Sequence, residues 1–320
     1  MAEKRVLVVT GPTASGKTAL GVALARRLGG EIISADSMQV YRGMDVGTAK
    51  VTPAEMGGIA HHLLDVADPA EDWSVARWVE AAAACAEDIF SRGRVPIFVG
   101  GTNLYIDSLL SGRDFAERED GGAVRAELSA EYDRIGGAAF RDALRRVDPE
   151  RAEKLHPSDK KRLVRAMEVW KLTGETISAH DARTRALPPR WKSLRVALTY
   201  ADRAALYARI DRRVDEMVAA GLIDETARLL AAGLSPDSTA MQAIGYKETV
   251  AFLQGRCGKD EAVAAVKLAS RRYAKRQLTW LRRDAGLHWI VWADRPDIPA
   301  AADEVTALWT RDVLGEASEI

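Results

Sequence analysis

The clearest chemical pattern in this sequence is a pair of spaced glycines followed by a lysine and a threonine, a combination that is typical of phosphate-binding loops. Residues 11–18 read GPTASGKT, which matches G-x-x-x-x-G-K-[ST] at every specified position. In such a loop the backbone N–H groups surround phosphate oxygens, Lys17 adds a positive charge, and Thr18 offers a hydroxyl to Mg²⁺. The predicted phosphate-binding residues are Gly11, Pro12, Thr13, Ala14, Ser15, Gly16, Lys17 and Thr18. The pattern predicts a bound di- or triphosphate and leaves open whether phosphorus or carbon is attacked.

The stretches on either side of this loop predict the strand and the helix that it must join. Residues 6–10 form a short apolar run that suits a buried parallel strand. Residues 20–28 place leucine and alanine at helical spacing, and Gly29 ends that pattern. Because a helix N-terminus carries a positive partial charge, this junction favours an anion.

Two more polar positions follow predicted strands. Asp36 comes after the apolar run 31–35, and Thr102 comes after the run 95–99 and two glycines. Because the carboxyl ends of parallel strands share one edge of a sheet, both residues are expected beside Lys17. Asp36 could accept a proton, hold a metal through water, or simply cap a helix. Thr102 could cap a helix or face a substrate.

Two helices towards the C-terminus carry arginine and lysine in positions that suit an anionic partner. Arg213 and Arg209 lie one turn apart on a helix that begins at Asp202, and they could reach an anion if that helix passes over the cleft. The helix over residues 260–283 gathers seven cations and no acid on one half: Lys267, Arg271, Arg272, Lys275, Arg276, Arg282 and Arg283. Contact with a phosphate backbone is one interpretation of this face, and a solvated surface is the other.

Composition and charge exclude several classes of protein. Lys+Arg and Asp+Glu balance at 46 each, so the net charge gives the protein no general attraction for a polyanion such as a nucleic acid. Cys85 and Cys257 have no metal-ligand spacing and suit a reduced compartment. The chain enters its first strand without a signal-peptide pattern, and no apolar run approaches the roughly 18 residues of a membrane span. We therefore expect a cytoplasmic protein without membrane contact.

The charge pattern also predicts the domain organisation. From about residue 113 charges become dense, and helical patterns continue without a strand until a run at 194–199. We predict an α/β fold, with a parallel sheet of the P-loop NTPase type flanked by helices and interrupted by a helical insertion domain. The predicted core comprises residues 1–113 and 193–320, and the insertion comprises residues 114–192.

Taken together, these motifs resemble the tRNA dimethylallyltransferase family, also called tRNA isopentenyltransferases. The matching blocks run in order over about nine-tenths of the chain, at residues 11–18, 36–50, 61–65, 96–105, 155–165, 244–247 and 273–282. Asn103 stands where the family has a third glycine in its Gly-Gly-Thr-Gly turn.

The resemblance implies transfer of a dimethylallyl group from dimethylallyl diphosphate to the exocyclic amine of the adenosine just 3′ of certain anticodons, with release of diphosphate. Lys17, Arg213 and Mg²⁺ on Thr18 would stabilise the charge of the leaving diphosphate. Asp36 would orient the amine and take its proton, with Thr102 beside it. The adenosine must be flipped out of its stack to reach such a cleft.

The resemblance and the basic helix together predict a surface for the tRNA anticodon stem-loop. Its residues are Asp36, Ser37, Met38, Gln39, Thr102, Arg125, Lys161, Arg162, Leu163, Val164, Arg165, Arg271, Lys275, Arg276, Gln277, Trp280 and Arg282. The helical insertion and the basic helix would hold the loop on either side, and we expect the protein to act as a monomer.

Three other functions share some of these features. A small-molecule or nucleotide kinase also has the phosphate-binding loop and a helical insertion that serves as a lid. An isopentenyltransferase for free adenine nucleotides would differ only in its acceptor, and the basic helix favours tRNA. A non-catalytic, nucleotide-switched RNA binder would need an acidic strand end of the Walker-B type, for which the sequence offers no obvious residue.

Overall fold

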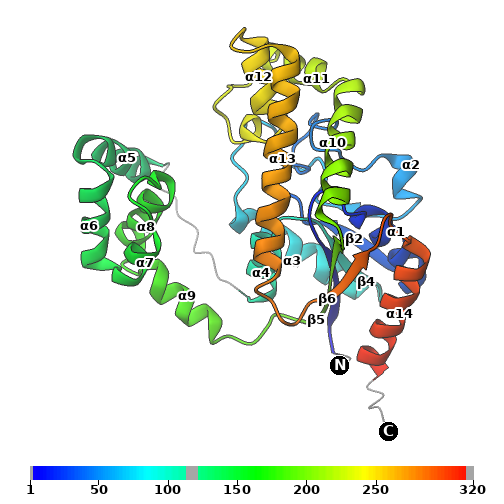
Figure 1. Cartoon of the computed structure of the whole chain (residues 1–320). Helices are drawn as coiled ribbons and strands as arrows, with labels where there is room; N and C mark the ends of the chain where they lie inside the picture. Colours follow the sequence, from blue (N-terminus) through cyan, green and yellow to red (C-terminus); the bar gives the residue numbers. More distant parts are fainter. Residues whose placement is uncertain (1–2, 113–121, 315–320) are drawn as a thin grey trace. The chain divides into compact units, whose positions relative to one another are not determined.

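The computed structural model describes residues 3–112 and 122–314, which form two compact units (Figure 1). One unit comprises Met1–Leu110 with Trp191–Ile320, and the other comprises Ser111–Arg190. The predicted boundary between residues 113 and 114 lies outside the described residues. The strand expected at 194–199 runs from Lys192 to Tyr200.

The larger unit is built on a six-stranded sheet with the order β3-β2-β4-β1-β5-β6. Every neighbouring pair of strands is parallel, which confirms the predicted α/β arrangement. The strands are β1 Arg5–Thr10, β2 Gly30–Ser34, β3 His61–His62, β4 Val95–Val99, β5 Lys192–Tyr200 and β6 His288–Trp292. Since helices cover both faces of a parallel sheet, its two central strands have buried apolar runs, at residues 6–9 of β1 and 96–99 of β4.

Different helices cover the two faces of this sheet. On one face, Leu7 and Val9 of β1 pack in a core cluster with residues of α1, α10 and α14. On the other face, Trp78 of α3 contacts Phe98 of β4, with ring centroids 6.3 Å apart. The indole N–H of Trp78 also donates to the Ser34 carbonyl at 3.0 Å, so α3 is fixed to the end of β2.

The helices of the larger unit that begin at Lys17, Arg203 and Lys259 were predicted from the sequence. The helices at Pro53–Met56, Leu222–Ala231 and Tyr246–Leu253 were not predicted. The full set in this unit is α1 Lys17–Leu28, α2 Pro53–Met56, α3 Val75–Ser91, α4 Asn103–Leu110, α10 Arg203–Ala219, α11 Leu222–Ala231, the 3-10 turn η1 Ala240–Gln242, α12 Tyr246–Leu253, α13 Lys259–Leu281 and α14 Ile298–Leu314. The basic helix is α13, and it lies beside α10 (Figure 1).

The smaller unit is helical throughout its described residues, as its sequence pattern predicts. Its helices are α5 Ala123–Ile135, α6 Gly137–Val147, α7 Pro149–Lys154, α8 Lys160–Thr173 and α9 Ile177–Arg185. Leu128, Phe140, Leu144 and Leu163 are each no more than 1% exposed and form the centre of its core.

Candidate active site

The phosphate-binding loop has the backbone that an anion nest requires. Gly11 has φ 145°, and a Cβ there would lie 2.7 Å from the Leu198 carbonyl oxygen, so only glycine fits. Gly16 has φ 92° and precedes the first turn of α1 without a side-chain cap. Trp292 of β6 holds the loop from outside, because its indole N–H donates to the Ser15 carbonyl at 2.9 Å. The uncapped N–H groups at the start of α1 are therefore available to an anion.

Lys17 and Arg213 bring two positive charges to this nest. The Lys17 amine donates to the Pro12 carbonyl at 2.7 Å. Burial and, to a lesser extent, nearby Arg213 lower the pKa of Lys17 to about 7, although Asp36 opposes the shift. Burial also lowers the pKa of Arg213. Two neighbouring cations that are partly withdrawn from water destabilise each other, and a bound anion relieves that cost.

Asp36 and Thr102 meet at the carboxyl edge of the sheet, as the strand order predicts. The Asp36 carboxylate accepts the backbone N–H of Met38 at 2.9 Å and that of Gln39 at 3.3 Å, both through Oδ1. The Thr102 hydroxyl accepts the backbone N–H of Ser37 at 3.1 Å. Asp36 thus caps a turn rather than a helix, and these bonds fix the direction of its second carboxylate oxygen.

Asn103 ties this edge to the first strand. Its side chain is 7% exposed and accepts the Thr10 hydroxyl at 3.0 Å. Thr102 still reaches Ser37, so the asparagine at the usual glycine position leaves the turn intact. Gly100 is essential to the turn, because a Cβ there would lie 2.1 Å from the Ala35 carbonyl oxygen.

A cavity of about 410 Å³ connects these groups. Thr13, Asp36, Ser37 and Arg213 line its polar side. Its apolar side chains come from α10, α13 and the segment before α12, and they are Ile210, Val214, Met217, Ile244 and Val266. The cavity therefore joins an anion site and a carboxylate to an apolar wall.

Tyr273 and Gln277 of α13 are site residues whose positions the sequence did not predict. The Tyr273 hydroxyl forms a hydrogen bond with Thr102, and burial together with Asp36 raises the pKa of Tyr273 to about 12. Gln277 was predicted to contact tRNA, but it is 5% exposed and both ends of its amide bind backbone. In the sequence, the only sign of these contacts is that the polar groups of Tyr273 and Gln277 lie on the apolar face of the helix.

Only part of the predicted basic face of α13 is free of ion pairs with the described residues. Lys267 pairs with Asp215 and Arg271 pairs with Asp211, each at 2.6 Å, so these two cations hold α13 to α10. Arg271 was predicted to bind tRNA, and this contact stays a prediction for a side chain that already pairs with Asp211. The exposed cations that remain are Arg272, Lys275, Arg276, Arg282 and Arg283. Trp280 is 40% exposed, and its N–H donates to Asp107 at 2.6 Å.

Of the predicted RNA-contacting residues in the smaller unit, some are buried and others are exposed. Leu163 and Val164 are 0% and 5% exposed and belong to the helical core, so their side chains are turned away from solvent. Lys161, Arg162 and Arg165 are exposed on α8. Arg125 and Arg165 both bind the buried Glu168, at 3.0 Å and 2.7 Å, which leaves them on the surface in fixed positions.

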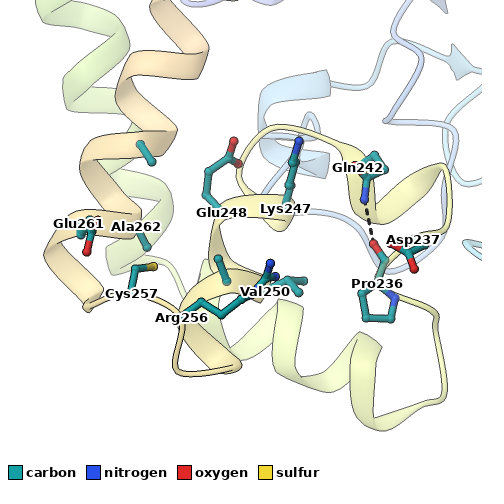
Figure 2. A pocket seen from close by; sticks show the side chains of 12 residues that line it. Pro236, Asp237, Gln242, Lys247, Glu248, Val250, Arg256, Cys257, Glu261 and Ala262 are labelled. Carbon is teal, nitrogen blue, oxygen red and sulfur yellow. Dashed lines mark hydrogen bonds between the residues drawn. The ribbon is translucent and has the colours of Figure 1, made fainter. Parts of the chain in front are cut away.

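A second cavity, of about 390 Å³, lies between α12 and the start of α13 (Figure 2). Lys247 and Arg256 line it, and so do three acids: Asp237, Glu248 and Glu261. No residue of the phosphate-binding loop lines it. The mixed charges favour no single ligand, so the candidate site is the cavity beside Asp36.

None of the helices within residues 3–112 and 122–314 is both long and apolar enough to cross a membrane.

Comparisons with known proteins agree with this geometry. The family model described as IPP transferase matches residues 39–284, and the one described as isopentenyl transferase matches residues 4–69. A tRNA dimethylallyltransferase of Symbiobacterium thermophilum is 50% identical over 286 residues, which cover 89% of this chain and 88% of the relative.

Solved structures give the same result. A full-length tRNA isopentenylpyrophosphate transferase from Bacillus halodurans matches with a TM-score of 0.72 and 40% identity, over 98% of this chain and 100% of that one. A eukaryotic dimethylallyltransferase described as acting on tRNA matches with a TM-score of 0.85 and 27% identity, over 99% of this chain and 81% of that one. The chain is therefore a transferase with a P-loop NTPase-like fold that belongs to the tRNA dimethylallyltransferase family.

Proposed function

We propose that this protein transfers the dimethylallyl group of dimethylallyl diphosphate to the N6 amine of the adenosine 3′-adjacent to the anticodon in certain tRNAs, and releases diphosphate. One observation carries the proposal. A single cavity has Thr13 of the phosphate-binding loop, Arg213 and Asp36 on its polar side and an apolar wall that suits a five-carbon group. Arg213 and Asp36 also lie close enough to Lys17 to shift its pKa. A kinase would need the phosphate site but has no need of the apolar wall.

In the proposed reaction the allylic C–O bond breaks and its electron pair leaves with the diphosphate. The loop N–H groups, Lys17 and Arg213 stabilise the charge that grows on the leaving group. The adenosine nitrogen forms the new C–N bond, and its proton passes to the free oxygen of Asp36. Because the amine lone pair is delocalised into the purine, the alignment of Asp36 matters more than its basicity. Thr102 and Tyr273 complete the polar wall beside Asp36.

We propose Mg²⁺ as the cofactor. Among the described residues no group of three or more His, Cys, Asp or Glu side chains could hold a metal alone. The Thr18 hydroxyl is exposed in the first turn of α1, which suits an ion held mainly by diphosphate oxygens and water. When bound, Mg²⁺ would neutralise part of the charge on the leaving diphosphate.

The proposed tRNA-binding residues are exposed cations of each unit. Lys275, Arg276 and Arg282 on α13 would bind the phosphate backbone, as would Arg125, Lys161, Arg162 and Arg165 in the helical insertion. Asp36, Ser37, Met38 and Gln39 would meet the flipped adenosine. We further propose that the protein acts as a monomer in the cytoplasm.

The proposal is tested by incubating the protein with dimethylallyl diphosphate, Mg²⁺ and tRNA that lacks the modification, followed by mass analysis of the tRNA nucleosides. We expect one adenosine per target tRNA to gain a dimethylallyl group. A parallel reaction with AMP as acceptor separates the tRNA enzyme from one that acts on free nucleotides. Unmodified tRNA in the first reaction, or transfer of a phosphoryl group from ATP to an acceptor, would refute the proposal.

A further inference from the structure

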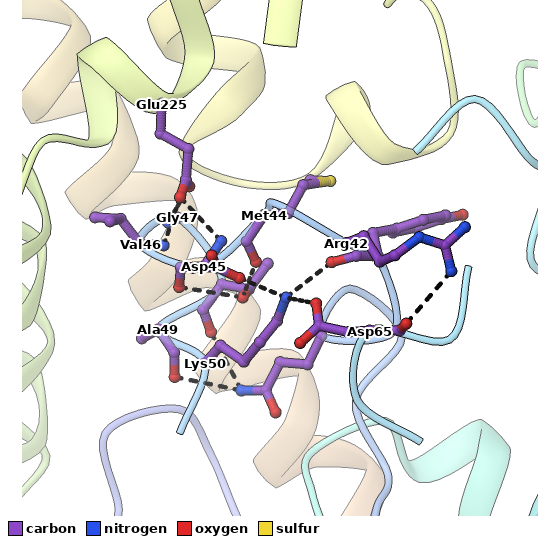
Figure 3. Close-up of polar contacts among 12 residues, drawn as sticks. Arg42, Met44, Asp45, Val46, Gly47, Ala49, Lys50, Asp65 and Glu225 are labelled. Atoms are coloured by element: carbon purple, nitrogen blue, oxygen red, sulfur yellow. Dashed lines mark hydrogen bonds and ion pairs between the residues drawn. The ribbon is translucent and has the colours of Figure 1, made fainter. Parts of the chain in front are cut away.

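Glu225 of α11 is a buried acid whose charge is met by the backbone of the segment 45–47. It is 1% exposed. Its Oε2 accepts the N–H groups of Asp45 at 3.0 Å and Val46 at 2.9 Å, and its Oε1 accepts the Gly47 N–H at 2.9 Å (Figure 3). A buried carboxylate is costly unless it is fully hydrogen-bonded, and bonds to an ionised acceptor are strong. The segment is therefore firmly attached to α11.

Tyr246 holds the same segment from the other side. It is 0% exposed, and its hydroxyl donates to Glu225 Oε1 at 2.6 Å. Its ring lies so close to Gly47 that a Cβ there would be 2.4 Å from the nearest ring atom. The close approach requires glycine at this position, and residue 47 has no room to move towards the ring.

The segment continues into the wall of the candidate active site. Gly47, Thr48 and Ala49 line the cavity that contains Asp36. The carbonyls of Thr48 and Ala49 both accept the side-chain N–H groups of Gln39, each at 3.3 Å. The backbone N–H of Gln39 in turn donates to the Asp36 carboxylate. Hydrogen bonds at Gly47 and Gln39, joined by the short stretch of chain at 47–49, thus connect Glu225 to Asp36.

We propose that Glu225 is a positioning residue that orients Asp36 through the segment 45–49 and Gln39. Tyr246 keeps the Glu225 carboxylate aimed at that segment. The inference rests on the proposed function, because it requires Asp36 to take part in the reaction. It assigns a role in catalysis to an acid that makes no contact with the cavity.

The first test is Glu225→Gln in the full-length protein, assayed with saturating donor and varied tRNA. The new amide NH₂ faces backbone N–H donors, so the segment loosens and Asp36 loses its alignment. We expect kcat to fall by about 10-fold to 100-fold, while KM for tRNA changes by less than about 3-fold. An unchanged kcat would overturn the proposal.

Glu31→Gln is the matched control. Glu31 is also buried, at 3% exposed, and it binds His62 and Arg92 at the far end of β2. Both variants should lower the unfolding temperature, whereas only Glu225→Gln should lower kcat. An equal fall of kcat in the two variants would reduce Glu225 to a structural role.

A double-mutant cycle with Gln39→Ala tests the route. Without the Gln39 amide, the segment 45–49 is no longer hydrogen-bonded to the residue that binds Asp36. Adding Glu225→Gln to this variant should therefore lower kcat by less than about 3-fold. The same 10-fold to 100-fold loss in both backgrounds would show that Glu225 does not act through Gln39.

Tyr246→Phe is a milder test that can be used if the Glu225 variant fails to fold, because this change removes only one hydroxyl. The segment is also held by Lys50, which pairs with Asp45 and Asp65 at 2.6 Å each. We expect a stable variant with kcat lowered by roughly 3-fold to 10-fold. If the wild type modifies tRNA and Tyr246→Phe does so at full rate, this inference fails and the proposed function stands. If the wild type itself leaves tRNA unmodified, the proposed function fails.

Discussion

The side-chain amide of Gln277 accepts the backbone N–H of Thr13 at 3.0 Å, so a helix near the end of the chain directly supports the phosphate-binding loop. The other end of the same amide donates to the Gly101 carbonyl at 2.9 Å. A Cβ at Gly101 would lie 2.2 Å from the Gln277 nitrogen, so the glycine is needed for this contact. Gln277 therefore joins the phosphate-binding loop at 11–18 to the turn that carries Thr102.

Gln277→Leu should weaken donor binding and stability together. The change leaves a buried N–H and a buried carbonyl without partners, which costs about 1–3 kcal/mol each. We expect a lower unfolding free energy and a KM for dimethylallyl diphosphate raised by about tenfold. Thr279→Ala on the exposed side of the same helix is the control and should change neither value. A normal donor KM in Gln277→Leu would contradict the supporting role.

Lys17 should make donor binding depend on pH. Its pKa is lowered to about 7 in the free protein, and a bound anion favours the protonated amine and raises that pKa. A proton is then taken up on binding above pH 7, so affinity is highest below that pH and weakens as pH rises. Calorimetric titration of diphosphate between about pH 6 and about pH 9 measures the effect.

Lys17→Arg provides the control for this titration. A guanidinium stays charged throughout the range, and the ligand's own titration is common to both proteins. The variant should bind with a flatter pH dependence. Identical profiles in the two proteins would mean that Lys17 is protonated before the anion arrives.

The exposed cations of α13 should control tRNA binding. Lys275→Glu with Arg282→Glu should raise KM for tRNA and lower the salt slope of binding by about one for each phosphate that is no longer neutralised. Arg271 is unsuitable for this test, because reversing its charge would break its ion pair with Asp211 and loosen α10 from α13. Lys259→Glu at the opposite end of α13 is the matched control. If KM for tRNA and the salt slope were the same in the wild type, the double variant and the control, these cations would have no role in tRNA binding.

Asp36→Ala should reduce turnover far more than tRNA affinity. The carboxylate is proposed to align the amine and accept its proton, so we expect kcat to fall by about 10²–10⁴-fold. Because the exposed cations are proposed to supply most of the binding free energy for tRNA, KM for tRNA should change by less than about 3-fold. Steady-state kinetics with varied tRNA measures both values. Comparable losses in kcat and affinity would make Asp36 a binding residue only.

Glu31 should contribute to stability in a defined pH window. Hydrogen bonds from Arg92 and His62 lower its pKa to about 2. The group is therefore stabilising above its ordinary pKa near 4.5, and this contribution is lost as pH falls from there towards 2. Urea unfolding of the wild type and Glu31→Gln should differ at neutral pH and converge in acid. A difference that stays constant across this range would contradict the predicted ion pairs.

The parts of the site that sequence predicted are those determined by local pattern. The loop at 11–18, Asp36 and Thr102 each follow a strand, and the rule that parallel strands end at one edge brings them together. The sheet, the helical insertion and the basic face of α13 follow from hydrophobic periodicity in the same way.

The remaining features depend on contacts between distant segments. Periodicity places Arg271 on a polar face, but only the packing of α13 on α10 shows that Asp211 neutralises it. Glu225 resembles any surface acid on a helix until the backbone of 45–47 is brought against it. Gln277 was predicted to contact tRNA, and Tyr273 was not among the predicted site residues. Only the folded structure shows that Gln277 binds the backbone of Thr13 and Gly101 and that Tyr273 bonds with Thr102.

Transfer of carbon rather than phosphorus is tested most directly with a donor that is labelled in both its dimethylallyl and its diphosphate part. Dimethylallyl diphosphate labelled in its carbon chain and in its phosphorus is incubated with the protein, Mg²⁺ and unmodified tRNA. We expect the carbon label to enter tRNA and an equal amount of phosphorus label to appear as free diphosphate. Phosphorus label on the tRNA, or diphosphate release without carbon transfer, would contradict it.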